Sequence, residues 1–505
     1  MSQAVSQTVE AFRQYVREME HYQEALSLMY WDLRTGAPKK GVPLRSEAIG
    51  TLSSAVFRMS TSPQMEEYLN TLGDPGVYNG LDPVTRAMVR EFRKEFDRAR
   101  KIPPERYHAY VVLVSKAESV WEEAKAKADF ALFRPYLEQI VAMTVEFVDY
   151  WGYKDDKYDT LLDQYEPGMT VAQLDPIFDN LRQETVDLLN RIVATGRRFD
   201  DKRFYRGYDT ALQRKLSHYL LEQMGYDFTA GRVDETVHPF QTTINHYDTR
   251  VTTKFLTEDL RSNLFSTIHE GGHALYEQGV SDELIGTGLC SGTSMGIHES
   301  QSRFWENMIG RSRPFWEAHY RYILELFPSQ FADISLDDFY RSVNDVRPSL
   351  IRTEADELTY NLHIMIRYEI EKGLINGQLQ VADLPAVWRE KMQEYLGVTP
   401  SNDAEGVLQD VHWSGGSFGY FPSYALGNIY AAQFAHALAK DIPDYMEQVR
   451  RRNLLPIKQW LNEHIHRFGK MLEPKEIVQQ VTGEAIDAKY LIGYLKDKFS
   501  ALYNL

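Results

Sequence analysis

The chain has 505 residues, of which 43% are hydrophobic and 25% are charged, the balance of a folded globular protein. Acidic residues outnumber basic residues by 72 to 56, and this net charge of −16 argues against nucleic acid or an anionic membrane surface as a partner. The single cysteine, Cys290, excludes an internal disulfide and any multi-cysteine zinc or iron–sulfur site. No signal peptide or apolar run of about 20 residues is visible, so we expect a cytoplasmic protein.

Most of the chain is predicted to be helical, because apolar residues recur three and four positions apart. Leu137, Ile140, Val145 and Val148, for example, would form one apolar stripe along a helix. The same pattern predicts helices over residues 8–29, 81–101, 107–128, 170–196, 210–224, 302–326, 357–372, 427–440 and 446–467. Proline- and glycine-containing turns separate several of these segments.

One segment departs from the helical pattern. Residues 231–255 are rich in Thr, Val and Ile, and their polarity nearly alternates. Since β-branched side chains pack well on a pleated surface, the segment predicts short strands. We expect a small antiparallel sheet inserted in a mostly α-helical protein.

The most specific motif is His269-Glu270-Gly271-Gly272-His273. Two histidines four positions apart on a helix lie on the same face, so both imidazoles can reach one metal ion. Glu270 is offset around the helix and can approach a metal-bound water without being a ligand. Asp259 or Ser262 would cap the start of this helix, and Gly279 would follow its end.

A zinc hydrolase needs three protein ligands and one position open to water. No third histidine follows His273 at the spacing of the extended HExxHxxGxxH motif. Glu299, at the start of a later helical segment, is therefore the expected third ligand. The alternative for Glu299 is an acidic residue that merely stabilises a helix N-terminus.

These motifs belong to a longer ordered set, through which the sequence resembles the carboxypeptidase Taq family of HExxH zinc metallocarboxypeptidases nearly from end to end. The matching segments are His238–Phe240, Asp248–Thr252, His269–His273, His298–Gln301, Ile351–Asp356 and Gly406–Trp413. The resemblance implies a nearly all-helical, two-lobed molecule with a deep substrate groove, in which the small sheet lies beside the active-site helix. It also implies a zinc-dependent exopeptidase that releases single C-terminal residues with broad specificity, and a homodimer.

The expected roles follow hydrolytic chemistry. His269, His273 and Glu299 would hold one Zn²⁺ per chain, with cobalt or another divalent ion as a possible substitute. Glu270 would take a proton from the zinc-bound water as it attacks the peptide carbonyl. His412 and Tyr420 are the expected donors to the oxyanion, and Tyr424 is the reserve. The alternatives are a core histidine beside Trp413 and an ordinary packed tyrosine.

A carboxypeptidase must also recognise a free C-terminal carboxylate, for which a guanidinium is well suited. Arg352 and Arg250 are the expected substrate-binding residues. Structural ion pairs are the alternatives, with Glu354 or Asp356 for Arg352 and with Asp248 for Arg250. Arg347 is a further candidate.

No repeat or interdomain linker interrupts the sequence, so residues 1–505 are expected to form a single catalytic unit. Residues 1–230 would be a helical N-terminal part, and residues 231–430 would contain the strands, the zinc site and the substrate-binding segments. Residues 431–505 would be C-terminal helices. The expected partners are peptides with a free C-terminus. The competing functions are a helical zinc endopeptidase or dipeptide-releasing enzyme, and a non-catalytic binding scaffold.

Overall fold

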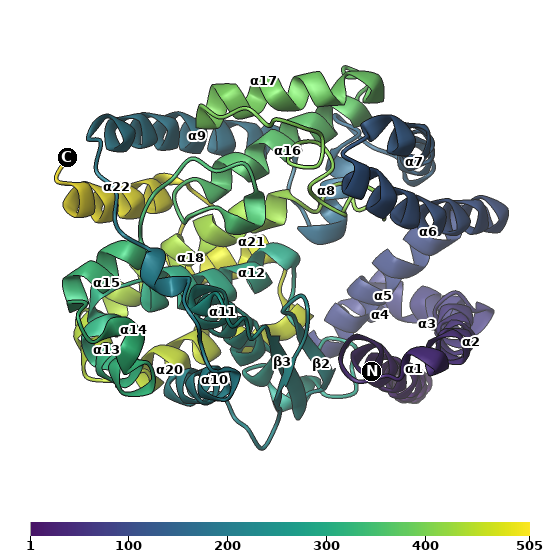
Figure 1. Ribbon diagram of the computed structural model, residues 1–505. Helices are drawn as coiled ribbons and strands as arrows, with labels where there is room; N and C mark the ends of the chain where they lie inside the picture. The colour runs from purple at the N-terminus through teal and green to yellow at the C-terminus, as the bar shows by residue number, and fades with distance from the viewer. Residues whose placement is uncertain (1) are drawn as a thin grey trace.

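The computed structural model describes residues 2–505 and shows a mostly helical chain (Figure 1). The N-terminal helices are α1 (Gln3–Thr35), α2 (Val42–Ser60), α3 (Pro63–Gly73), α4 (Pro75–Tyr78) and α5 (Pro83–Lys101). They are followed by α6 (Pro104–Lys127), α7 (Phe130–Trp151), α8 (Asp159–Tyr165), α9 (Val171–Ala194) and α10 (Thr210–Met224). These bounds confirm the helices that the sequence predicts up to residue 224.

The second half of the chain adds a sheet and further helices. Its strands are β1 (Val233–Glu235), β2 (Gln241–Asn245) and β3 (Asp248–Thr253). Its first helices are α11 (Leu260–Gln278), α12 (Met295–Arg303), a π-helix (Phe304–Gly310), α13 (Arg313–Leu326), α14 (Pro328–Phe331) and α15 (Leu336–Val343). The remaining helices are α16 (Tyr360–Ile375), α17 (Leu384–Leu396), α18 (Pro422–Asp441), α19 (Tyr445–Arg450), α20 (Leu455–His464), α21 (Pro474–Thr482) and α22 (Lys489–Tyr503). Short 3₁₀ turns occupy Lys39–Gly41, Lys202–Phe204, Asp282–Leu284, Arg352–Glu354, Val381–Asp383 and His466–Met471.

Two predicted helices are divided. The segment 302–326 contains the end of α12, the π-helix and α13, and α13 has its own start because the Ser312 hydroxyl accepts a hydrogen bond from Phe315 N. The segment 446–467 is divided between α19 and α20. Arg452 there adopts a left-handed backbone conformation (φ 61°), which ends a helix.

The sheet is mixed, which corrects the expectation of a purely antiparallel one. β3 lies in the middle, antiparallel to β2 and parallel to β1, with Val251 opposite both Gln241 and Val233. The segment between β1 and β2 contains Pro239, which lacks a backbone N–H, and the chain crosses there to the other edge of β3. Both β2 and β3 pack against α11, so the sheet lies beside the helix of the HExxH motif as expected.

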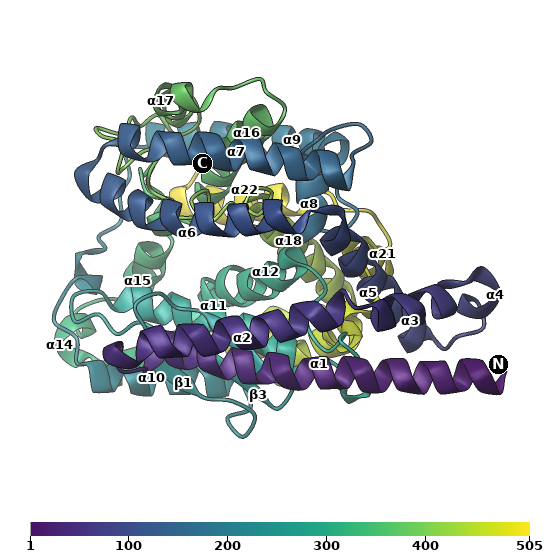
Figure 2. The ribbon, with the colours of Figure 1, turned by 90° about the vertical axis from the view of Figure 1, so that its right-hand side faces the viewer.

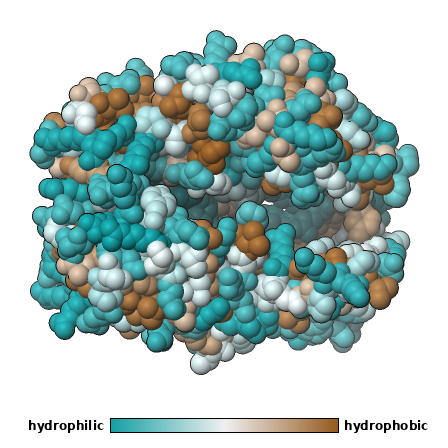
Figure 3. Space-filling model, in the orientation of Figure 1, coloured by the Kyte–Doolittle hydropathy of each residue, from teal (hydrophilic) through white to brown (hydrophobic). Residues whose placement is uncertain are grey.

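The helices form two lobes (Figures 1 and 2). One lobe contains α6–α9, α16 and α17, and the other contains α1–α3, α10, α13, α14, α20 and the sheet; α12 and α18 lie between them. The surface of Figure 3 is deeply hollowed between the lobes, at the height of α11 and α12 in Figure 1. The predicted two-lobed, grooved architecture is therefore confirmed.

Two hydrophobic cores support this arrangement. The larger core extends from α6 to α22 and includes the buried faces of α11, α12 and α18. The smaller core joins α1, α3 and α5 to the segment after α11, through side chains such as Phe12, Met65, Met88 and Leu284. No helix in the described part of the chain combines the length and hydropathy needed to span a bilayer.

Candidate functional site

The position of the HExxH helix α11 depends on the cap at its N-terminus and on its two glycines. An Asp259 carboxylate oxygen accepts hydrogen bonds from Arg261 N (2.9 Å) and Ser262 N (3.3 Å), so Asp259 is the N-cap of α11. A Cβ on Gly271 would lie 2.5 Å from Leu221 Cδ2 of α10, and one on Gly272 would lie 2.6 Å from the backbone oxygen of Gln301 in α12. Glycine in the middle of the motif therefore lets α10 and α12 approach α11 closely.

The helix that carries Glu299 is held from two sides. Ser294 caps α12 by accepting a hydrogen bond from Ile297 N at 3.0 Å. On the opposite side, a Cβ on Gly427 of α18 would lie only 2.4 Å from Glu299 Cγ. The side chain of Glu299 is thus confined between α11 and α18.

The three predicted metal ligands converge. Glu299 Oε2 lies 3.5 Å from His269 Nε2 and 3.4 Å from His273 Nε2. Their potential ligand atoms all lie within 4.8 Å of one another, and this is the single such group of His, Cys, Asp and Glu side chains found within residues 2–505. Two imidazole nitrogens and one carboxylate oxygen are a donor set that suits zinc.

His269 is oriented by a carboxylate that the sequence analysis missed. Its Nδ1 lies 2.9 Å from Glu306 Oε2 in the π-helix. Since a carboxylate accepts the hydrogen bond, Nδ1 carries the proton and the lone pair of Nε2 faces Glu299. Such carboxylate–histidine pairs are typical of protein metal sites.

His273 is oriented through a second histidine. Its Nδ1 lies 2.6 Å from His298 Nδ1, and His298 Nε2 lies 2.9 Å from Glu277 Oε1. His298 donates from Nε2 to Glu277 and therefore accepts at Nδ1, so His273 donates from Nδ1 and keeps its Nε2 lone pair free. Glu277 also accepts from Gly292 N at 2.8 Å and from Thr243 Oγ1 of β2 at 3.0 Å.

Arginines compensate the buried carboxylates. Arg303 Nε lies 2.6 Å from Glu299 Oε1, and Arg311 Nη2 lies 2.9 Å from Glu306 Oε1. Burial alone would raise the pKa of Glu299, but the charge of Arg303 holds that pKa well below its usual value. Glu299 is therefore ionised at neutral pH, as a carboxylate ligand of a metal ion would need to be.

Glu270 differs from these carboxylates because, among residues 2–505, its side chain makes no hydrogen bond or ion pair. Only 8% of the residue is exposed, and burial raises the pKa of Glu270 to about 7. Next to the three ligands, it is an unpartnered group that can exchange a proton.

The predicted oxyanion donors gather on the chain between α17 and α18. His412 Nε2 lies 3.3 Å from Tyr424 Oη, and the rings of His412 and Tyr420 are 5.5 Å apart. Burial lowers the pKa of His412 to about 4 and raises the pKa of Tyr420 to about 12. The negative charge of Glu299 also contributes to the raised pKa of Tyr420.

Arg352 is buried among aromatic rings and paired with Asp410, which is not one of the two carboxylates that the sequence suggested for it. Its Nη2 lies 2.8 Å from Asp410 Oδ1, and its Nη1 donates to Tyr360 Oη at 3.0 Å. Arg367 shares the same carboxylate at 2.5 Å. Two guanidinium groups therefore face one carboxylate, and an excess positive charge remains. Tyr360 also contacts Arg303, whose guanidinium lies 4.4 Å from its ring centroid.

The other two arginines have local acidic partners. Arg250 forms a two-pronged ion pair with Asp248 of the same strand, at 2.6 and 2.7 Å, and lies over Trp31. Arg347 pairs with Asp345 and Asp201 and donates to Phe199 O. Their guanidinium groups do not contact the metal ligands in the described structure.

Glu306, Glu277 and Arg303 are the functional residues that sequence reasoning missed. A partial signal exists in the spacing of Glu299, Arg303 and Glu306, which places two acids and a base on one helix face. Glu306 lies 37 positions from its partner His269, and Glu277 lies 21 positions from its partner His298, so no local pattern specifies these contacts.

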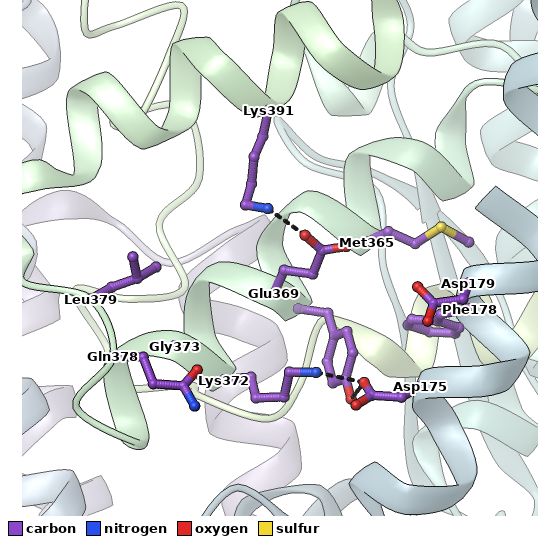
Figure 4. A pocket seen from close by; sticks show the side chains of 11 residues that line it. Asp175, Phe178, Asp179, Met365, Glu369, Lys372, Gly373, Gln378, Leu379 and Lys391 are labelled. Carbon is purple, nitrogen blue, oxygen red and sulfur yellow. Dashed lines mark hydrogen bonds and ion pairs between the residues drawn. The ribbon is translucent and has the colours of Figure 1, made fainter. Parts of the chain in front are cut away.

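A separate cavity of about 350 Å³ lies in the lobe that contains α9, α16 and α17 (Figure 4). Four of its charged side chains are paired with one another, Lys372 with Asp175 at 2.6 Å and Lys391 with Glu369, and Asp179 pairs with Arg182 outside the lining. None of the predicted site residues lines it. The candidate site is therefore the centre at α11 and α12.

Comparisons with known proteins agree with this centre. The sequence model of the carboxypeptidase Taq (M32) metallopeptidase family matches residues 11–499. The chain is 50% identical to carboxypeptidase 1 of Bacillus subtilis (strain 168) over 494 residues, which cover 98% of each protein. It is 41% identical to thermostable carboxypeptidase 1 of Thermus thermophilus, over 97% of this chain and 98% of that protein.

A solved structure shows the same likeness. The M32 carboxypeptidase of Deinococcus radiodurans R1 superposes with a TM-score of 0.96 at 34% identity, covering 99% of this chain and 100% of that one. The ligand set, the unpartnered Glu270 and these full-length matches lead to one conclusion. This chain belongs to the carboxypeptidase Taq (M32) family and is a metallocarboxypeptidase, a peptide hydrolase.

Proposed function

We propose that this enzyme is a zinc-dependent carboxypeptidase that releases single C-terminal amino acids from peptides with broad specificity. The observation that carries the proposal is the convergence of His269, His273 and Glu299 beside the unpartnered carboxylate of Glu270.

The residues fit a zinc ion. Both histidines are anchored through Nδ1, so the two Nε2 lone pairs and Glu299 Oε2 form an anionic N₂O donor set. When bound there, zinc would acidify a water molecule and polarise the peptide carbonyl. The same donors accept cobalt or another divalent ion, because affinities in this series follow metal availability as well as ligand type.

Glu270 is the proposed general base. Burial raises its pKa to about 7, and a divalent cation beside it would lower that pKa again, so the carboxylate would be ionised near neutral pH. It would accept a proton from the attacking water and deliver the proton to the leaving amine.

His412 and Tyr420 are the proposed donors to the oxyanion. Their shifted pKa values, about 4 and about 12, leave a neutral imidazole and a protonated phenol at neutral pH, and both groups then carry a hydrogen to donate. His412 Nδ1 is buried and has no hydrogen-bond partner within residues 2–505. Tyr420→Phe and His412→Gln should each lower kcat with little change in KM, and an unchanged kcat would contradict the role.

Arg352 and Arg250 are the proposed ligands of the substrate's terminal carboxylate. Arg352 is favoured, because it and Arg367 share one acid, whereas Arg250 is fully matched by Asp248. Arg352→Lys keeps the charge but loses the planar fork, so it should raise KM for peptides with a free C-terminus. An unchanged KM would exclude this role.

The expected partners are peptide substrates, and neither nucleic acid nor a membrane is proposed as a partner. From the family resemblance we further propose a homodimer in the cytoplasm. Sedimentation that shows only a 58.6-kDa species at micromolar concentration, or activity recovered outside the cytoplasmic fraction, would contradict these points.

The catalytic proposal is tested by Glu270→Gln, which preserves size and removes the base. We expect zinc content near that of the unmodified enzyme and a fall in kcat of about 10²-fold or more, the range for a general base. Glu258→Gln, at an exposed position before α11, is the matched control and should keep full activity. Normal turnover by the Glu270 variant would overturn the mechanism.

A further inference from the structure

The loop of residues 411–421, which carries both His412 and Tyr420, is irregular and must be shaped from outside. Its internal hydrogen bonds form short turns within residues 411–418, such as Ser417 N to His412 O at 2.9 Å. Gly419 has a φ of 90°, and a Cβ there would lie 2.6 Å from the backbone oxygen of Leu161. The loop therefore depends on its contacts with α6, α8 and α16 for its conformation.

The buried side chain of Glu371 in α16 contacts the loop at two positions, one next to His412 and one next to Tyr420. Glu371 Oε1 accepts a hydrogen bond from Trp413 Nε1 at 2.7 Å, directly after His412. Glu371 Oε2 accepts from Gly419 N at 2.9 Å, directly before Tyr420. Tyr158 Oη donates to the same Oε2 at 2.6 Å.

The carboxylate is unusual because its three partners are all neutral. Glu371 is fully buried and forms no ion pair within residues 2–505. Burying a carboxylate is costly unless hydrogen bonds replace its hydration, and here the replacement comes mainly from the loop. If packing were the only requirement, an apolar side chain could fill this space without the desolvation cost of a carboxylate.

We propose that Glu371 is a positioning residue that fixes the loop 411–421, so that His412 and Tyr420 face the metal centre. The inference rests on the proposed function of those two side chains as oxyanion donors. Glu371 does not touch substrate; it acts through Trp413 and Gly419.

Glutamine is the informative replacement, because it has the same size but one oxygen. In Glu371→Gln the amide nitrogen replaces one of the two oxygens, so it faces either the Trp413 N–H or the Gly419 N–H. In both orientations an N–H donor of the amide points at an N–H donor of the loop, and no hydrogen bond forms there. One end of the loop therefore loses its anchor. Tyr158→Phe removes one hydrogen bond and keeps the carboxylate, so it is a milder second variant.

The experiment compares these variants, loaded with zinc at pH 8, by steady-state kinetics, zinc content and hydrogen–deuterium exchange. For Glu371→Gln we expect kcat to fall about tenfold or more, KM and zinc content to change little, and exchange to rise in peptides covering 411–421. For Tyr158→Phe we expect a smaller fall in kcat, about twofold to tenfold.

Glu357→Gln is the control, since Glu357 is another acid, with a side chain only 5% exposed, and it pairs with Tyr494 and Lys498 away from the loop. It should lower thermal stability and leave kcat unchanged.

A double variant separates positioning from general stability. In Glu371→Gln/Trp413→Phe the clashing donor is gone, and glutamine can still accept from Gly419 N. We therefore expect kcat no lower than in Glu371→Gln alone. Losses that multiply would overturn the proposal.

Two failures are distinguishable. If the unmodified enzyme releases C-terminal residues and Glu371→Gln keeps both kcat and loop protection, the positioning role is wrong. If the unmodified enzyme does not act as a carboxypeptidase, the proposed function fails. In that case increased exchange in 411–421 of Glu371→Gln would still support the anchoring, and unchanged exchange would overturn it.

Discussion

His269 and His273 present the same ring nitrogen to one point because each is held at the opposite nitrogen. Glu306 fixes one ring directly, and Glu277 fixes the other through His298. The lone pairs needed by a metal are therefore oriented in advance, and little entropy is lost on binding.

Glu306→Gln tests this orientation at the scale of one residue. The amide is a weaker acceptor for His269, and Arg303 and Arg311 lose their charged partner. We expect zinc affinity to fall about 10- to 100-fold, measured by competition with a chelator. Glu317→Gln, in a surface pair with Arg313 and Arg450, should leave the affinity unchanged. Equal affinities in both variants would contradict the account.

The sequence alone predicts the ligands and Glu270, because His269, Glu270 and His273 lie within one helical turn. The predicted ligands do converge, and Glu299 is contacted from both α11 and α18. Glu371 could not be predicted, since its partners Tyr158 and Trp413 are 213 and 42 positions away. Contacts of that kind depend on the packed fold and leave no local pattern.

At the scale of elements, the site depends on how closely α11 and α12 pack. Gly272 allows the backbones to meet, and Gly427 lets α18 close over Glu299 from the other side. The HExxH helix is thus both a carrier of ligands and a packing surface.

Gly272→Ala is the corresponding prediction. Its Cβ would lie 2.6 Å from Gln301 O and 2.7 Å from Ser302 Cα, and these backbone atoms cannot move aside cheaply. We expect a loss of about 1–3 kcal/mol in stability and a reduced zinc content, measured by thermal unfolding and metal analysis. Gly50→Ala in α2, where a Cβ would meet nothing within 4 Å, should instead raise stability slightly. A stable, fully zinc-loaded Gly272→Ala enzyme would refute this reading of the contact.

The sequence largely predicts which segments are helices and which are strands, but it does not predict where a helix is interrupted. The apolar pattern of 302–326 continues through the π-helix, because every residue of Phe304–Gly310 is buried. The pattern therefore does not distinguish a π-helix from an α-helix. Likewise, periodicity does not reveal the left-handed Arg452 that separates α19 from α20. The parallel β1–β3 pair was missed because β-branched composition specifies strands but not their direction.

At the scale of the whole molecule, two lobes enclose the groove and bury several histidines that are not among the predicted ligands. Burial lowers the pKa of His319 and of His466 to about 3, and the pKa of His363 also lies well below its ordinary value. These rings stay neutral in the folded protein, but in the unfolded chain they bind protons below about pH 6.5. Stability from this source is present above that pH and is lost as the pH falls towards 3.

His319→Gln tests this linkage. In the metal-free protein we expect the unfolding temperature to fall between pH 7 and pH 5, and to fall less in the variant. One such group contributes up to about 1.4 kcal/mol per pH unit. His108→Gln, at an exposed position of α6, should match the unmodified protein. An identical pH dependence in all three proteins would contradict the assignment.

We expect the groove to lead the free C-terminus of a peptide to the metal centre. The most direct measurement uses one ten-residue peptide in two forms, with a free and with an amidated C-terminus, incubated with zinc-loaded enzyme and followed by mass spectrometry. We predict successive losses of single residues from the free form and an intact amidated form. Internal cuts, release of dipeptides, or equal cleavage of both forms would contradict the account and indicate an endopeptidase or a dipeptide-releasing enzyme.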